Sequence, residues 1–335
     1  MKPFSLLVKP AGGGCNLACH YCFYNKHPGG LMSIDLARKA FDKYAMLPFA
    51  EKSVALQGGE PILAAGTGIF KLLDEYPFEK SVQTNATLLT DELAAQLASG
   101  NWLVGASLDG PEDLNRLRGE SFDATVRGIR LLEKHGVDYN LLTVVSKANV
   151  AKPVEVYRFL RDNFSTRFHQ YIECTGPCDE ITGDEWGEFL VGLFDEWIKK
   201  DANRISVRLF DSIVSQVLLG HPTQCSFGTS CRQYLVIEHD GSVYPCDFHV
   251  RDDLRLGNIA TDSFESMQNS PIYRDFSDAK MANLPTKCRE CRYVGFCNGD
   301  CPRNRRTLCA GWLRFFDHAL PRLRQLAIEA AFRGT

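Results

Sequence analysis

The sequence lacks any apolar run long enough to cross a membrane, and it lacks a strong excess of charge. A membrane-spanning helix needs about 18 or more largely apolar residues in succession, and the sequence contains no such run. The N-terminal stretch MKPFSLLVKPAGGGCN holds too short an apolar run for a signal peptide. The 38 Lys and Arg residues and the 41 Asp and Glu residues leave a net charge of −3. We therefore expect a cytoplasmic protein with no general affinity for nucleic acid or membranes.

Cysteine, by contrast, is abundant, with 13 residues in a chain of 335. A small secreted protein would use so many in disulfides, but this chain is large, shows no export signal and has an odd number. In a reducing compartment the thiols stay reduced, and ligation of metals or iron–sulfur clusters becomes the better interpretation. Three cysteines lie near the N-terminus, Cys174 and Cys178 lie mid-chain, and eight lie between Cys225 and Cys309.

Residues 1–220 alternate short apolar runs, predicted as strands, with longer amphipathic stretches, predicted as helices. The strands are expected at residues 5–9, 53–57, 81–84, 103–107, 140–145 and 168–173. The helices are expected at residues 33–44, 68–75, 90–97, 122–134, 152–163 and 183–199. Six β–α units predict parallel strands with right-handed crossovers, and six are too few for a closed eight-fold barrel. The fold class is therefore α/β, with an open, partial (β/α)6 TIM-like barrel over residues 1–220 whose functional residues lie at the carboxyl ends of the strands.

A second, cysteine-rich domain is predicted over residues 221–335. Two strand-like runs, 234–238 and 243–246, flank an Asp-Gly turn and predict a β-hairpin. A loop-rich region follows, and then a helix from about residue 312 to 332. Few regular elements with many cysteines indicate a module that its metal centres hold together.

The N-terminal cysteines have the spacing Cys15-x3-Cys19-x2-Cys22, on the loop after the first strand. Three thiolates can hold three irons of a [4Fe–4S] cluster and leave the fourth iron open to the amino and carboxylate groups of S-adenosylmethionine (SAM). A zinc site is the alternative, but zinc usually closes with four ligands, and His20 is the nearby fourth candidate. The motif resembles the signature of the radical SAM superfamily, which cleaves SAM to a 5′-deoxyadenosyl radical.

The segment Gln57-Gly58-Gly59-Glu60-Pro61 follows the second strand. Paired glycines let a backbone approach a ligand closely. The segment resembles the superfamily element that binds the amino group of SAM, which implies contacts at Gly58, Gly59 and Glu60. A side chain at residue 59 is expected to obstruct SAM without changing the iron content.

The eight C-terminal cysteines are enough for two fully ligated clusters, but their spacing alone also allows two zinc sites. The run Cys-x2-Cys-x5-Cys-x3-Cys with a following cysteine resembles the SPASM domain, which carries auxiliary [4Fe–4S] clusters in peptide-modifying radical enzymes. That resemblance implies a first auxiliary site on Cys225, Cys231, Cys246 and Cys301. It implies a second auxiliary site on Cys288, Cys291, Cys297 and Cys309. Cys174 and Cys178 remain and are interpreted as thiols outside the clusters, with substrate contact left open.

Further stretches narrow the resemblance from the superfamily to one family. They are residues 5–11, 83–85, 107–111, 240–248 and 256–259. With the cysteine motifs, they resemble the anaerobic sulfatase-maturating enzymes over nearly the whole chain. Those enzymes convert a cysteine or serine of a sulfatase to Cα-formylglycine. The resemblance implies three [4Fe–4S] clusters, SAM, a peptide or unfolded sulfatase-type substrate, and an electron donor such as flavodoxin or ferredoxin.

The same resemblance assigns roles to single residues. SAM contacts are implied, beyond the glycine segment, at Tyr21, Ser107, Arg118 and Thr175, with Arg116 as the alternative to Arg118. Tyr24 and Gln57 are expected near the peptide, and Asp247 matches the family's proposed general base. In the implied reaction the radical removes a hydrogen from Cβ of the target, Asp247 takes the thiol or hydroxyl proton, and an auxiliary cluster receives the electron.

Two alternatives stay open at the level of the sequence. A related SPASM enzyme that forms thioether or carbon–carbon crosslinks shares these motifs, although full cysteine ligation of both auxiliary clusters favours electron transfer. A zinc or iron–sulfur protein without catalysis would differ in iron content and in deoxyadenosine production.

Overall fold

A parallel sheet forms the centre of the protein in the computed structural model, which describes residues 2–175 and 179–333. Seven strands pair in parallel in chain order: β1 (Ser5–Val8), β2 (Ser53–Leu56), β3 (Glu79–Thr84), β4 (Leu103–Ser107), β5 (Tyr139–Val145), β6 (Phe168–Glu173) and β7 (Ser206–Val207). The six predicted strands are confirmed within two residues at each end. The short β7 is an addition that the sequence pattern did not reveal.

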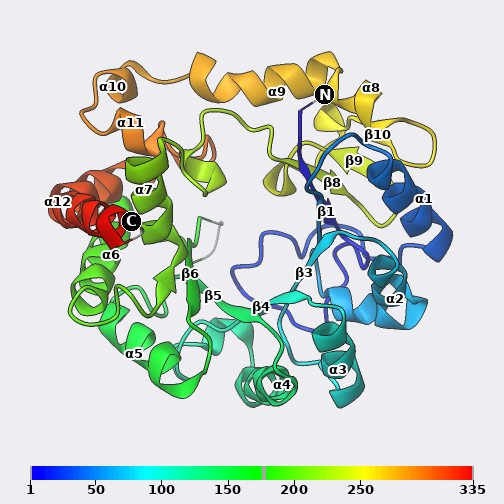
Figure 1. Ribbon diagram of the computed structural model, residues 1–335, viewed down its shortest axis with the longest axis horizontal. Coiled ribbons are helices and arrows are strands. Elements are labelled where there is room, and N and C mark those ends of the chain that lie inside the picture. Colours follow the sequence, from blue (N-terminus) through cyan, green and yellow to red (C-terminus); the bar gives the residue numbers. More distant parts are fainter. Residues whose placement is uncertain (1, 176–178, 334–335) are drawn as a thin grey trace.

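Helices cover the outer, convex side of this curved sheet, as Figure 1 shows. They are α1 (Ile34–Ala45), α2 (Ile69–Asp74), α3 (Asp91–Ser99), α4 (Phe122–His135), α5 (Pro153–Asn163) and α6 (Gly183–Trp197). Their starts follow local chemistry: Ser33 and Thr90 cap α1 and α3, and Thr182 forms a capping box with Glu185 at α6. The predicted partial barrel is therefore confirmed, with its helices in the expected places.

The predicted hairpin is present, but it belongs to the barrel sheet. β8 (Tyr234–Ile237) pairs in parallel with β1, β9 (Ser242–Tyr244) pairs antiparallel with β8, and the short β10 (Gly257–Asn258) lies at the edge. A single ten-stranded sheet results. The division near residue 220 follows α7 (Arg208–Leu219) and stays a prediction, since the sheet itself continues across it.

The region predicted as loop-rich contains four helices: α8 (Phe264–Gln268), α9 (Pro271–Ala282), α10 (Thr286–Arg289) and α11 (Val294–Cys297). The expectation was wrong for α9, whose Ser270 cap and Pro271 at the first helical position are recognisable start signals. In Figure 1, α9 crosses from the hairpin side of the molecule to α10 and α11, and closes the ring of helices.

The last helix, α12 (Cys309–Arg333), begins three residues earlier than predicted and packs on α6 and α7. Glycines let it approach α6: a Cβ on Gly311 would lie 2.3 Å from the carbonyl oxygen of Gly183. Trp186 and Trp312 meet edge to face beside this contact, with ring centroids 5.8 Å apart. The contact fixes the C-terminal module against the end of the barrel.

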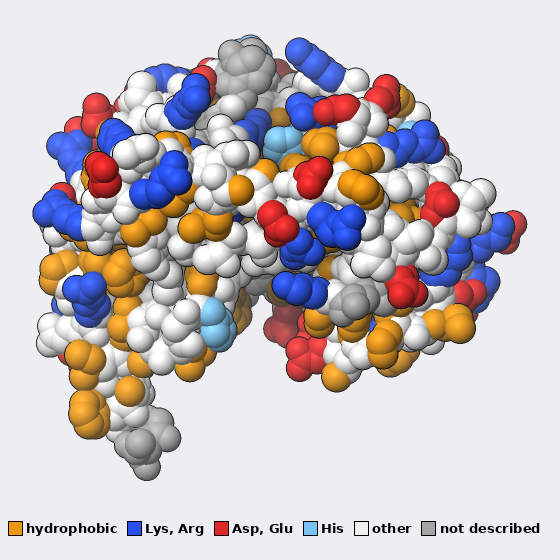
Figure 2. All heavy atoms as spheres, turned by 90° about the horizontal axis from the view of Figure 1, so that it is seen from above, with side chains coloured by type: hydrophobic (Ala, Val, Ile, Leu, Met, Phe, Trp, Pro, Cys, Tyr) orange, Lys and Arg blue, Asp and Glu red, His pale blue; other side chains and the backbone are white. Residues whose placement is uncertain are grey.

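The surface carries charges of both signs. Figure 2, which views the molecule from the side of α9, shows acidic and basic side chains interspersed, as a net charge of −3 leads one to expect. Among the described residues, no helix is both long and apolar enough to span a membrane.

Candidate active site

The N-terminal cysteines lie on the loop between β1 and α1, at the carboxyl end of the barrel. Cys22 is close enough to disfavour ionisation of Cys15, and both Cys15 and Cys22 are close enough to disfavour ionisation of Cys19. Burial and these neighbours raise the pKa of Cys15 and Cys19. Three such thiols become ligands when a metal centre displaces their protons. The structure thus brings together the three residues assigned to the SAM cluster.

Two strand ends hold this loop. The Gly59 N–H donates to Gly12 O at 2.8 Å, and the Glu60 N–H donates to Gly14 O at 2.7 Å. Asn85, just after β3, donates its side-chain amide to Cys15 Sγ at 3.8 Å. The glycine segment after β2 is therefore a support of the cysteine loop as well as a candidate SAM contact.

The close approach of Gly59 to the cysteine loop overturns the expectation that a side chain at residue 59 leaves the iron content unchanged. A Cβ on Gly59 would point at the cysteine loop, 1.9 Å from Gly14 O. A side chain there must disturb the backbone directly before Cys15, so an unchanged iron content is no longer expected. Gly58 has a positive φ of 123°, which favours glycine at the turn itself.

Glu60 is buried, and its carboxylate is used inside the protein. It accepts from the N–H groups of Ile62 at 3.0 Å and Asn85 at 2.8 Å, and from Thr84 Oγ1 at 2.8 Å. Burial raises the pKa of Glu60 against these donors. The Glu60 side chain thus holds the glycine segment in place, and only the backbone of residue 60 remains available to contact SAM.

Tyr21, Asp109 and Arg118 form a buried network beside the cysteine loop. The Tyr21 hydroxyl donates to Asp109 Oδ2 at 2.5 Å and accepts from Arg118 Nη1 at 2.9 Å. Arg118 Nε is buried without a hydrogen-bond partner. Arg116, in contrast, is exposed and bonds Asp113 O at 2.9 Å. The geometry favours Arg118 over Arg116 as the residue available to a carboxylate ligand.

The other candidate SAM residues lie at strand ends of the same edge. Ser107 ends β4, and Thr175 follows β6, where its carbonyl accepts from Arg303 Nη2 at 3.5 Å. Cys174 is buried at the same end of the barrel, and Cys178 lies outside the described residues. With the cysteine loop after β1, the glycine segment after β2 and Asn85 after β3, this edge gathers residues from five strands.

Asp247 lies in the short 3-10 turn Asp247–His249, which follows the hairpin. Its Oδ1 forms an ion pair with Lys9 Nζ, and about a fifth of its side chain stays exposed. The Lys9 ammonium lies 3.3 Å from the centroid of the Tyr24 ring, and the Tyr24 hydroxyl donates to Glu238. Gln57 is joined to the same strand end, since its N–H donates to Val8 O at 2.9 Å. Asp247 and Tyr24 thus both contact the Lys9 ammonium, and Gln57 lies on the neighbouring strand end.

The eight C-terminal cysteines separate into the two predicted sets. Each of Cys225, Cys231, Cys246 and Cys301 has at least one other member of its set near enough to affect its ionisation. Burial, followed by Asp247 and the other thiols, raises the pKa of Cys246 to about 12. Lys280 donates to Ser226 O at 2.6 Å beside this set. Its buried ammonium places positive charge where a cluster with four thiolates would be anionic.

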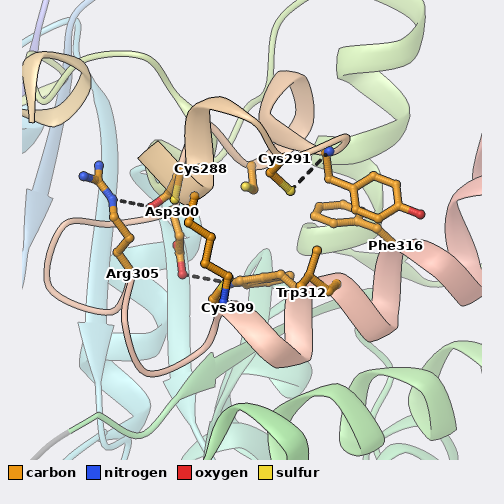
Figure 3. A pocket seen from close by; sticks show the side chains of 12 residues that line it. Cys288, Cys291, Asp300, Arg305, Cys309, Trp312 and Phe316 are labelled. Carbon is orange, nitrogen blue, oxygen red and sulfur yellow. Dashed lines mark hydrogen bonds between the residues drawn. The ribbon is translucent and has the colours of Figure 1, made fainter. Parts of the chain in front are cut away.

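The second set lines one pocket, drawn in Figure 3. Cys288 and Cys291 approach it from α10 and the turn after it, Cys297 ends α11, and Cys309 begins α12. Asp300, at the edge of the pocket, accepts from Trp312 Nε1 at 2.8 Å. Since Asp300 precedes Cys301, it connects the two auxiliary sets.

These arrangements fit iron–sulfur clusters. In the described residues no three His, Cys, Asp or Glu side chains converge on a single metal ion. The second set surrounds a pocket with four thiols, the donors that iron–sulfur clusters use. The three-cysteine group has one thiolate fewer than a [4Fe–4S] cluster has irons, so one iron is left for SAM.

Comparison with known proteins agrees with this geometry. The family model of the radical SAM superfamily matches residues 10–160, and that of an iron–sulfur cluster-binding domain, SPASM, matches residues 225–292. A serine-type anaerobic sulfatase-maturating enzyme of Bacteroides thetaiotaomicron is 32% identical, over 96% of this chain and 90% of its own length. A cysteine-type enzyme of Clostridium perfringens is 33% identical, over 98% of this chain and 99% of its own.

Solved structures show the same relation. Native anSMEcpe with bound AdoMet and Cp18Cys peptide superposes with a TM-score of 0.92 at 32% identity, and the match covers 98% of this chain and 100% of that one. Streptococcus suis SuiB bound to its precursor peptide SuiA has a TM-score of 0.71 at 17% identity, over 90% of this chain and 72% of that one. The second likeness shows a shared fold alone.

A partial barrel with an open cysteine triad, joined to a module with two four-cysteine sets, defines the class: a radical SAM enzyme with a SPASM domain and three [4Fe–4S] clusters. Within that class, the chain belongs to the family of anaerobic sulfatase-maturating enzymes. The alternative of a non-catalytic metal-binding protein is thereby set aside.

Sequence reasoning assigned no role to three residues that the site uses. Asn85 and Asp109 follow β3 and β4, where the rule that functional residues lie at strand ends already places them, but their partners could not be predicted. Lys9 also follows a strand, but a lone lysine at the end of a strand is ordinarily solvent-exposed. No local signal indicated that it is buried.

Proposed function

We propose that this enzyme oxidises Cβ of a cysteine or serine in a sulfatase-type protein and so makes Cα-formylglycine. The observation that carries the proposal is the position of Asp247, which directly follows a cysteine of the first auxiliary set and keeps about a fifth of its side chain exposed. The relatives' names support the reaction type, and the peptide in a related structure supports a peptide as substrate.

Each group of residues has a part in this proposal. The bound clusters and SAM supply the radical that removes one hydrogen from Cβ and the acceptor for the electron left behind. Cys15, Cys19 and Cys22 would hold the SAM cluster, and the two four-cysteine sets would hold the auxiliary clusters. Glu60 fixes the glycine segment, while Tyr21 and Asp109 orient Arg118 toward SAM.

The remaining proton falls to Asp247. Loss of a hydrogen atom, a proton and an electron from a serine side chain gives the aldehyde directly. The same loss from cysteine gives a thioaldehyde, and water then releases hydrogen sulfide and leaves the aldehyde. A carboxylate within reach of the target thiol or hydroxyl accepts the proton as a general base. Tyr24 and Gln57 would contact the peptide beside it.

We also infer the partners that this chemistry needs. A low-potential carrier such as a flavodoxin or ferredoxin would supply the electrons. Eleven ligand cysteines must stay reduced until they bind iron, which supports work in the cytoplasm.

Anaerobic turnover with matched peptides tests the function. Peptides of a sulfatase-type motif with cysteine, serine or alanine at the target position are incubated with reconstituted enzyme, SAM and a reductant, and their masses are measured. The serine peptide should lose about 2 mass units, the two hydrogens of the oxidation, and the cysteine peptide about 18, because oxygen also replaces sulfur. An intramolecular crosslink in place of an aldehyde would contradict the proposal and would favour the crosslinking alternative.

A further inference from the structure

Lys9 is a buried charged residue to which the proposed chemistry gives no part. Its side chain is 1% exposed. Its position is set by the sheet, because the Lys9 N–H donates to Ile237 O of β8 at 2.9 Å, and Val8 before it accepts from Gln57 after β2 at 2.9 Å. Burial of an ammonium group is costly unless a partner compensates it.

That partner is Asp247. The ammonium pairs with Asp247 Oδ1, a buried atom, while the side chain as a whole keeps about a fifth of its surface exposed. The contact is an ion pair rather than an aligned hydrogen bond. The pair therefore anchors one carboxylate oxygen inside the protein, while about a fifth of the side chain stays exposed.

The same ammonium also fixes Tyr24. The ring lies with its centroid 3.3 Å from Lys9 Nζ, a close cation–π contact. The Tyr24 hydroxyl donates to Glu238, which is buried, and His27 stacks on the ring with centroids 4.3 Å apart. Tyr24 comes from the cysteine loop and Asp247 from the segment after the hairpin, so Lys9 joins two parts of the chain that are distant in sequence.

We propose that Lys9 is a positioning residue that holds Asp247 and Tyr24 in place relative to the barrel. Asp247 lies on a short turn beyond the hairpin, which by itself gives little rigidity. Lys9 lies at the end of a strand that is hydrogen-bonded on both sides. Its ion pair therefore fixes the Asp247 carboxylate relative to the barrel edge, where the candidate SAM residues lie. This inference rests on the proposed function, since it assigns Lys9 an effect through the proposed base.

Three variants test it: Lys9→Met removes the charge at similar length, Lys9→Arg keeps the charge, and Lys80→Met serves as the control. Lys80 is also mostly buried and paired, with Asp74 at 3.1 Å, but it lies on β3 away from the site. The readouts are iron content, SAM affinity, and the ratio of formylglycine to 5′-deoxyadenosine. Lys9→Met should keep its iron and SAM affinity and lower the ratio by about 10- to 100-fold, since a displacement of about 1 Å can cost about 100-fold. Lys9→Arg should recover most of the loss, and Lys80→Met should behave as wild type.

The double variant Lys9→Met with Asp247→Asn decides whether Lys9 acts through Asp247. Coupled residues are non-additive, so Lys9→Met should reduce the ratio much less in the Asp247→Asn background than in wild type. A full additional loss, an unchanged ratio in the single variant, or loss of iron from Lys9→Met would each overturn the proposal. Failure of the proposed function is distinct, because wild-type enzyme would then consume SAM and leave the peptide without an aldehyde.

Discussion

Gly59→Ala adds one methyl group where the glycine segment crosses the cysteine loop. The new Cβ would lie 1.9 Å from Gly14 O and 2.6 Å from Gly14 C. Both are backbone atoms, which cannot turn away as a flexible side chain could. Because Gly14 precedes Cys15, the strain falls on the loop that carries the SAM-cluster thiols.

The magnitude follows from the distances. Ordinary van der Waals contact begins at 3.4 Å, so a Cβ that lies 1.9 Å from a carbonyl oxygen must push the two backbone segments apart. Such a shift breaks the hydrogen bonds from Gly59 N to Gly12 O and from Glu60 N to Gly14 O, now 2.8 and 2.7 Å long. Two backbone hydrogen bonds at about 1 kcal/mol each and overpacking of about 1–3 kcal/mol give a cost of about 3–5 kcal/mol.

The assay is iron content with SAM cleavage after anaerobic reconstitution. Wild type should hold about twelve irons, four in each of three clusters, and Gly59→Ala about eight. SAM cleavage should be lost together with the SAM-cluster signal in electron paramagnetic resonance. Gly66→Ala is the matched control, because its new Cβ would meet nothing within 4 Å. Full iron and normal SAM cleavage in Gly59→Ala would refute the reasoning, as would an equal loss in Gly66→Ala.

Three further predictions concern the clusters, the base and the SAM pocket. Simultaneous change of the N-terminal triad to Ala should remove about four of about twelve irons and abolish SAM cleavage, and zinc in the C-terminal module after anaerobic purification would contradict the cluster assignment. Asp247→Asn should retain all iron and SAM cleavage while formylglycine falls by about 10²–10⁴; modification at the normal rate would exclude Asp247 as the base, and loss of iron would give it a structural role. Tyr21→Phe takes a hydroxyl from the buried Asp109 and from Arg118, so it should weaken SAM binding and cost about 1–3 kcal/mol in unfolding experiments. Tyr76→Phe, which removes a hydroxyl bonded to Asp42 at the surface, is its control, and equal SAM affinity in the two variants would count against the network.

Local patterns predicted most of the barrel, for a physical reason. A buried parallel strand needs a short apolar run, and its covering helix needs an apolar stripe, so each β–α unit leaves a pattern within a short stretch of chain. The six strands and helices were found this way. β7 is two residues long, too short for such a pattern, and α9 was missed although Ser270 and Pro271 mark its start.

The chemistry of the site could be predicted from the sequence to a similar extent. The spacing of the three N-terminal cysteines on one loop shows that all three can reach one small cluster, so this group could be predicted without the fold. The eight C-terminal cysteines are enough for two clusters by their number alone. The choice between Arg116 and Arg118 did need it, because they are two residues apart on one 3-10 turn and only the tertiary packing buries Arg118.

By itself, then, the sequence predicted the β–α order and the cysteine spacing, since both depend on neighbours along the chain, and resemblance to a known family supplied the candidate base and the division of the C-terminal cysteines. The tertiary structure alone decided which distant groups meet. Pairing of β8 with β1 makes one sheet of both parts of the chain, and with it brings Asp247 onto Lys9 and Tyr24. Packing also brings Gly14 O to within 1.9 Å of the place where a Cβ on Gly59 would lie. Such contacts depend on the relative placement of segments that lie far apart in the chain, for which a local pattern of residue types carries no information.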